Sequence, residues 1–138
     1  MKKRTEDLLN EIMESTQISQ YLTENETEFL DMPLHLYLKQ LLDVKGFKIS
    51  QIAERSCKGE YIYQVFRGIK NPSRDVVLCI ALALQLTCPN AIQLLRIARM
   101  PALDARNRRD SIILFALNRN LSVPETNDIL YELGESCL

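Results

Sequence analysis

Apolar residues recur at intervals of three and four along most of this 138-residue chain, a spacing that predicts amphipathic helices. A first helix is expected over residues 4–21, with Leu8, Leu9, Ile12 and Met13 on one face. The chain contains only four glycines, and long β-branched runs are lacking. We therefore expect an all-α fold.

Punctuating residues divide the next part of the chain into short helices. A helix should begin at Pro33 and end at Gly46, because proline suits a first helical turn and glycine a helix end. Ser50 is the expected N-cap of a helix over 51–56. After the turn "SCKG", a further helix is expected over 59–67. Two short helices joined by a tight turn form a helix-turn-helix. Its inward-facing residues should be Ile52, Ala53, Ile62, Val65 and Phe66.

An internal repeat with an offset of 35 residues follows. "RDVVLCIALALQLTCPNAIQLL" begins at Arg74, and "RDSIILFALNRNLSVPETNDIL" begins at Arg109. Each copy reads as a helix, a short turn and a second helix, and Ser122 with Glu125 predicts a capping box. Such hairpins bury their apolar faces by stacking on neighbours. We expect them to extend the core of the helix-turn-helix, although two amphipathic helices can also resemble each other by chance.

Charge is distributed unevenly, although the net charge is −1. Residues 33–74 carry eight basic and three acidic residues, a net +5, whereas residues 1–32 carry three basic and eight acidic residues, a net −5. A basic middle is where polyanion binding is expected. No apolar run approaches the ~20 residues of a membrane span, and no secretion signal is evident, so we expect a cytoplasmic protein.

The sequence offers little for catalysis or for metal binding. Its four cysteines form no CxxC pair, and only His35 could join them as a nitrogen ligand, so we expect no metal, no cofactor and reduced cysteines. His35 is expected on a helix surface. One histidine, without a phosphate loop or a nucleophile–base pair, argues against an enzyme.

Candidate DNA contacts lie in and around the second helix of the motif, because that helix enters the major groove. Gln64 could pair with adenine, Glu60 could accept from cytosine N4, and Tyr61 could touch a thymine methyl group or a phosphate. Basic side chains supply affinity through phosphates rather than sequence information. The expected phosphate contacts are Lys58, Arg67, Lys70, Asn71 and Arg74. Arg74 with Asp75 is echoed by Arg109 with Asp110, so an ion-pairing role is an alternative for Arg74.

The stretch "SQIAERSCKGEYIYQVFRGIKNPSRDVVLCIALAL" resembles the lambda-repressor-like, or XRE-family, DNA-binding domain. The residues that carry the resemblance are Ser50, Gln51, Ala53, Gly59, Ile62, Gly68 and Pro72, and it covers about residues 34–100. It implies that Gln51 contacts a phosphate and that Gly59, Glu60, Tyr61 and Gln64 contact bases. The chain departs from the family pattern at Arg67, where glutamate is frequent, and in the turn "SCKGEY".

These observations predict three regions: an acidic N-terminal helix and connector (1–32), a helix-turn-helix domain (33–100) and a helical hairpin on the same core (101–138). The expected function is a sequence-specific transcriptional regulator that binds double-stranded DNA as a homodimer. The alternative is a protein-interaction adaptor whose partner binds the N-terminal helix or the C-terminal hairpin. The arginine-rich segment 96–109 could contact phosphates or the acidic N-terminal segment of a partner subunit.

Overall fold

The computed structural model describes residues 3–14, 16–19, 21 and 32–138. Every regular element within these residues is a helix, so the all-α prediction is confirmed. The chain divides into two compact units, Met1–Asp31 and Met32–Leu138. In the described residues no helix has both the length and the apolar character needed to cross a bilayer.

The first unit contains α1, Thr5–Glu14. Its Leu9, Ile12 and Met13 side chains are exposed. The expected helix over 4–21 is too long, because α1 ends at Glu14 and residues 16 and 17 are not helical. Residues 15 and 20 of that range lie outside the described residues.

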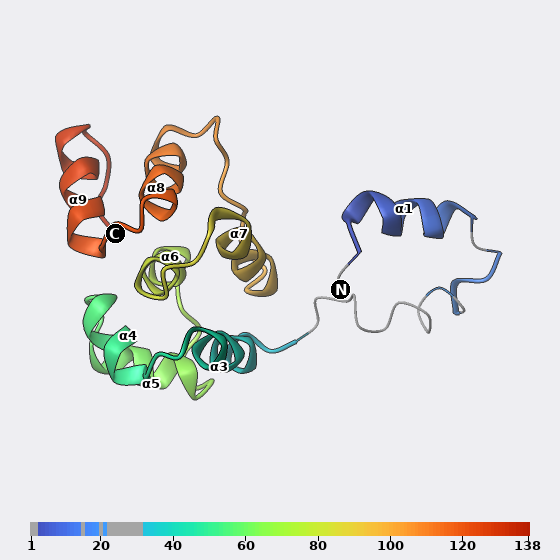
Figure 1. Cartoon of the computed structure of the whole chain (residues 1–138), viewed down its shortest axis with the longest axis horizontal. Coiled ribbons are helices and arrows are strands. Elements are labelled where there is room, and N and C mark those ends of the chain that lie inside the picture. The colour runs from blue at the N-terminus through green and yellow to red at the C-terminus, as the bar shows by residue number, and fades with distance from the viewer. Residues whose placement is uncertain (1–2, 15, 20, 22–31) are drawn as a thin grey trace. The chain divides into compact units, whose positions relative to one another are not determined.

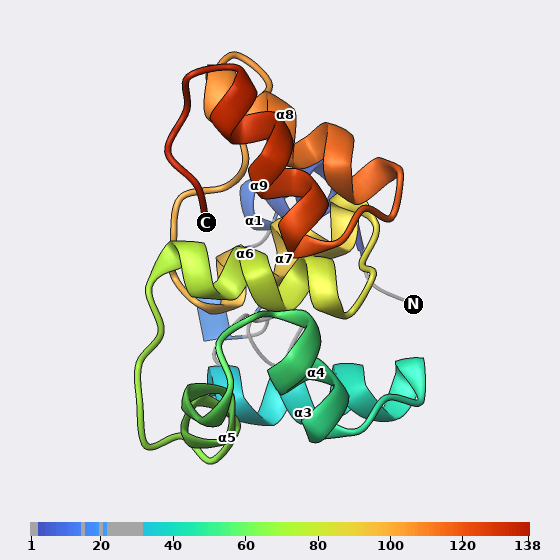
Figure 2. The same ribbon diagram turned by 90° about the vertical axis from the view of Figure 1, so that its left-hand side faces the viewer.

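The second unit is a stack of three layers (Figures 1 and 2). The central layer holds α6, whose residues Val77 to Ala83 are all buried. The central layer also contains α7. One outer layer contains α3, α4 and α5, and the other contains α8 and α9. The helices are α3 (Leu34–Lys45), α4 (Ile49–Arg55), α5 (Glu60–Phe66), α6 (Arg74–Ala83), α7 (Cys88–Ile97), α8 (Arg108–Asn118) and α9 (Val123–Glu132).

The two C-terminal hairpins repeat each other in local detail as well as in helix order. Thr87 and Ser122, 35 residues apart, are the N-caps of α7 and α9, and each hydroxyl accepts a backbone N–H three residues later. The Glu125 carboxylate accepts the Ser122 N–H at 3.0 Å, so the predicted capping box is confirmed. Gln85 and Asn120 both have positive φ angles, 56° and 53°, where the chain leaves α6 and α8.

A reciprocal pair of ion pairs joins the hairpins at the starts of α6 and α8. Arg74 binds Asp110 through two hydrogen bonds of 3.0 and 2.9 Å, and Arg109 binds Asp75 through two of 2.8 and 3.0 Å. The Nε donors correspond as well. Arg74 Nε donates to the Pro101 carbonyl, and Arg109 Nε donates to the carbonyl of Ser136, which lies 35 residues after Pro101. The arginine of each copy therefore contacts the aspartate of the other copy. Such a reciprocal pattern is expected when two copies are related by a two-fold axis.

These ion pairs shift the pKa values of two of their members. Burial raises the pKa of Asp110, but hydrogen bonds from the Arg74 guanidinium and from the Asp104 N–H outweigh burial and hold that pKa below its ordinary value. The hydrogen bonds from Arg109 to Asp75 raise the pKa of Arg109. The Asp110 carboxylate and the Arg109 guanidinium are therefore charged at neutral pH.

Candidate nucleic-acid interface

The first element of the candidate interface is α4, which begins two residues earlier than expected. Its N-cap is Lys48 rather than Ser50, so the predicted start of this helix is wrong. The Gln51 Oε1 atom accepts the Lys48 N–H at 2.9 Å, which satisfies a backbone donor at the helix start. Ile49, half-buried against the core, is thereby included in the helix. The Gln51 side chain is exposed, and its amide nitrogen remains available as a donor.

A tight turn then reverses the chain between α4 and α5. Ser56 is buried, and its hydroxyl donates to the Ala53 carbonyl at 3.3 Å. Gly59 donates its N–H to the same carbonyl at 3.1 Å. The Gly59 backbone has φ 57° and ψ −133°, a conformation that is essentially restricted to glycine. Gly59 therefore fixes the direction in which α5 leaves the turn.

The second helix of the pair, α5, buries one face and exposes the other. Ile62, Val65 and Phe66 are buried, so their predicted inward orientation is confirmed. Glu60, Gln64 and Arg67 lie on the opposite side, because residues three and four apart share a helix face. Glu60 and Arg67 are exposed and Gln64 is half-buried. This outward face consists of polar side chains that can donate or accept hydrogen bonds.

The loop after α5 folds back onto the end of that helix. Ile69 and Lys70 donate their N–H groups to the Gln64 carbonyl at 2.9 and 3.3 Å. The Tyr61 hydroxyl donates to the Asn71 carbonyl at 3.5 Å. Tyr61 is half-buried, so it supports the loop and also keeps part of its ring at the surface. The loop therefore presents Lys70 and Asn71 beside α5.

A close contact beneath this loop holds it against α3. Gly68 has a φ of 77°, and a Cβ atom at this position would lie 2.9 Å from the ring of His35. His35 is half-buried on α3, with its imidazole under the loop backbone. This histidine therefore has a packing role that the sequence did not predict.

Three basic residues flank α5 in the sequence, and the structure gives none of them a carboxylate partner among the described residues. Lys58 precedes α5, Arg67 is its C-cap, and Lys70 lies in the loop. None of them forms a salt bridge with any residue that the structure describes. Arg67 and Lys70 are exposed and Lys58 is half-buried. This cluster, Lys58, Arg67 and Lys70, is hereafter the basic cluster.

Arg74, the remaining basic candidate, has a different environment. Its guanidinium donates to both Asp110 oxygens and to the carbonyls of Pro101 and Ala102. Its side chain is three-quarters buried by these partners. The structure thus places Arg74 in an ion pair with Asp110 of α8, which was its alternative role. Arg74 is not brought together with the other candidate phosphate contacts.

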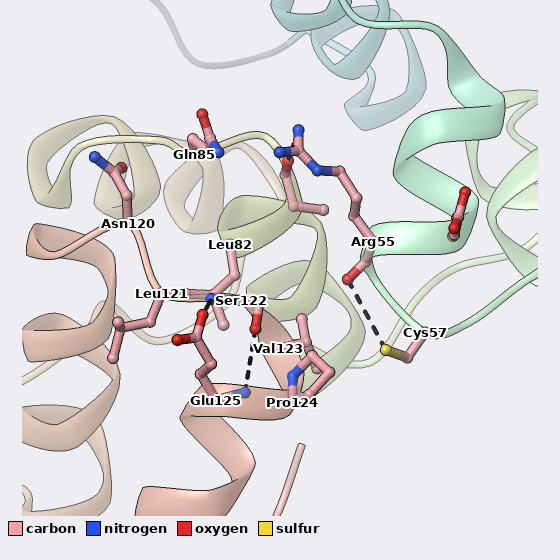
Figure 3. A pocket seen from close by; sticks show the side chains of 12 residues that line it. Arg55, Cys57, Leu82, Gln85, Asn120, Leu121, Ser122, Val123, Pro124 and Glu125 are labelled. Atoms are coloured by element: carbon pink, nitrogen blue, oxygen red, sulfur yellow. Dashed lines mark hydrogen bonds between the residues drawn. The ribbon is translucent and has the colours of Figure 1, made fainter.

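A cavity of about 430 Å³ lies between the α4–α5 turn and the turns of the two C-terminal hairpins (Figure 3). Two of its charged lining side chains have partners. The Glu125 carboxylate accepts from Ser122, and Arg55 donates to the Ala83 carbonyl at 3.4 Å and lies over the Phe47 ring. The amide side chains of Gln85 and Asn120 also line the cavity, and both residues are exposed.

The cysteines of the chain are all free. Burial raises the pKa of the Cys79 thiol to about 11, so Cys79 is protonated at neutral pH and packs as a small apolar residue in α6. Cys57 and Cys137 are exposed. Within the described residues there is no cluster of three or more side chains able to coordinate a metal.

Comparison of the chain with protein-family models, with curated protein sequences and with solved structures finds no match. The geometry and charge of the α4–α5 pair, and of the loop after it, are therefore the features from which a function can be inferred.

Proposed function

We propose that this protein is a sequence-specific DNA-binding regulator in which α4 and α5 form a lambda-repressor-like helix-turn-helix. The observation that supports this proposal best is the outward face of α5, which is polar, accessible and flanked by the basic cluster. A recognition helix needs hydrogen-bonding side chains toward the base edges and cations beside them for the phosphates.

Base contacts are assigned to the outward face of α5 and its start. Gln64 has the amide that pairs bidentately with adenine, and the carboxylate of Glu60 can accept from cytosine N4. Gly59 allows the backbone to approach the groove, since a Cβ atom is absent there. Tyr61 offers its exposed ring edge to a thymine methyl group.

Phosphate contacts are assigned to groups that have free donors. The amide nitrogen of Gln51 is free because only its Oε1 atom caps α4. The basic cluster supplies three cations, and Asn71 supplies an amide from the loop. Arg74 is omitted from this set because its guanidinium is bound to Asp110.

A second candidate function, protein-interaction adaptor, is favoured by exposed apolar side chains outside the α4–α5 pair. Phe115 and Leu133 in the second unit, and Met13 in α1, are large and solvent-exposed. Such residues mark protein contacts when they cluster. An adaptor does not need a basic cluster beside α5. A measurement of DNA binding therefore distinguishes the two candidate functions.

The test is a selection from random double-stranded oligonucleotides followed by a salt titration on the selected site. The variant Lys58→Ala/Arg67→Ala/Lys70→Ala removes three cations, so the slope of log K against log salt should fall by about 2 to 3. The comparison variant is Arg96→Ala/Arg99→Ala/Arg106→Ala, which removes three exposed arginines from the arginine-rich segment, the alternative phosphate contact. If the basic cluster beside α5 contacts the phosphates, this variant should leave the slope unchanged. Absence of any selected site, or an effect of the comparison variant alone, would overturn the proposal.

A further inference from the structure

An apolar groove lies on the outer face of the C-terminal hairpin, between α8 and α9. It is lined by Ser111, Ile112, Phe115, Ile129 and Leu133, and we name it the outer groove. Phe115 is 45% exposed and Leu133 is 46% exposed. Both side chains are large and apolar, so their exposure together leaves a continuous apolar surface open to solvent.

The repeat shows how this face is covered elsewhere in the same chain. Phe115 corresponds to Ile80, and Ile129 corresponds to Leu94, at the offset of 35 residues. Ile80 and Leu94 are both fully buried. In the first hairpin α4 packs on α6 and α3 packs on α7, and these contacts form the layer opposite α8 and α9 (Figure 2). The equivalent face of α8 and α9 has no such layer over it in the described part of the second unit.

The covering layer on the first hairpin indicates the size of the missing partner. It consists of two helices, α3 with 12 residues and α4 with 7. A pair of helices of similar length, and not a single extended peptide, is therefore the matching occupant. The hairpin of a second copy has this form, since α8 has 11 residues and α9 has 10.

The two helices that line the outer groove carry exposed charges of opposite sign. Arg119, at the end of α8, lies over the Phe115 ring at 4.5 Å from its centroid. Asp128 and Glu132 are exposed on α9, one turn apart. None of these three forms a salt bridge with a described residue. In a two-fold pairing, the basic α8 end of each copy faces the acidic α9 of the other, so both contacts are attractive.

We propose that two copies of this chain associate through the outer groove, with α8 of each packed against α9 of the other around a two-fold axis. Within one chain the two hairpins already pair reciprocally, through contacts at the starts of α6 and α8 and not through the outer groove. Because α3–α5 and α8–α9 form opposite outer layers of the second unit, the two α5 helices of this dimer lie at its far ends (Figure 2). The inference is independent of DNA binding.

Analytical ultracentrifugation of the full chain over a range of concentrations tests this interface. The wild type should show a concentration-dependent monomer–dimer equilibrium. Phe115→Asp should raise the dimer dissociation constant by about 30-fold or more, as expected for an interfacial anchor. The control is Tyr131→Asp, which changes a 79% exposed aromatic residue on another face of α9 and should leave the constant unchanged. Circular dichroism and thermal melting establish that each variant is folded.

A charge exchange gives an independent measurement. Arg119→Glu alone, and Asp128→Lys/Glu132→Lys alone, should each dimerise more weakly than the wild type, whereas the two variants mixed should form a heterodimer. A wild type that is monomeric at every concentration would overturn the proposal. So would a dimer that Phe115→Asp leaves intact, or charge variants that fail to pair on mixing.

Discussion

Replacing Arg74 with methionine should destabilise the fold more than the same replacement of Arg109. The two arginines make equivalent hydrogen bonds, and their side chains are similarly buried, with 24% and 19% exposed. The loss of the guanidinium itself is therefore nearly the same in both variants. The difference comes from the carboxylate that remains, because Asp110 is 8% exposed and Asp75 is 42% exposed.

The magnitude follows from the cost of leaving each carboxylate without its partner. Removing one member of a buried ion pair costs about 3–5 kcal/mol. Asp110 keeps the Asp104 N–H at 3.1 Å, so we expect a loss of about 2–3 kcal/mol for Arg74→Met. Asp75 is hydrated more easily, so Arg109→Met should cost about 1 kcal/mol.

Urea unfolding at pH 7, followed by circular dichroism, gives the two free energies. The double variant Arg74→Met/Asp110→Leu is informative because it replaces both charges by apolar groups, and it should recover much of the loss. Equal losses for the two single variants would refute the reasoning, since burial of the remaining carboxylate would then have no effect. A double variant less stable than Arg74→Met would also contradict it.

Other predictions concern acid stability and the glycines that shape the interface. The folded-state pKa of Asp110 is lowered, so its contribution to the free energy of unfolding is fully present above the unfolded-state pKa and is lost as pH falls below about 4. The free energies of unfolding of Arg74→Met and wild type, measured in urea, should therefore converge at low pH. Gly59→Ala should lower the free energy of unfolding by about 1–3 kcal/mol through backbone strain alone. Gly46→Ala should lower it by less, because a residue with a side chain adopts the left-handed angles of Gly46, φ 72° and ψ 22°, more readily. Gly68→Ala should add a clash with His35, and a combined His35→Ala change should relieve part of it in thermal melting.

Local sequence chemistry predicted much of the second unit. Gly46 ends α3, and Ser122 with Glu125 forms the capping box of α9. The inward faces of α4 and α5 follow from apolar spacing, because that spacing depends only on helix geometry. These features depend on residues within one or two helical turns of each other, so they can be predicted from the sequence without knowledge of distant contacts.

Features that depend on distant partners were less predictable. The arginine–aspartate repeat suggested an ion pair, but the partner of Arg74 lies 36 residues away and not beside it. Ser50 looked like a helix cap, yet burial of Ile49 places the helix start at Lys48. The outer groove escaped prediction because the two hairpins have the same apolar pattern, and only their positions in the stack decide which face is covered.

The most direct test of the DNA-binding account is the base preference of the Gln64→Ala variant on the selected site, compared with Lys70→Ala. If Gln64 contacts a base, its loss should reduce discrimination at one base pair by about 1–3 kcal/mol, measured by competition among single-base variants of the site. Lys70→Ala should weaken binding to all those variants alike. Unchanged discrimination in Gln64→Ala would mean that α5 does not lie in the groove as proposed.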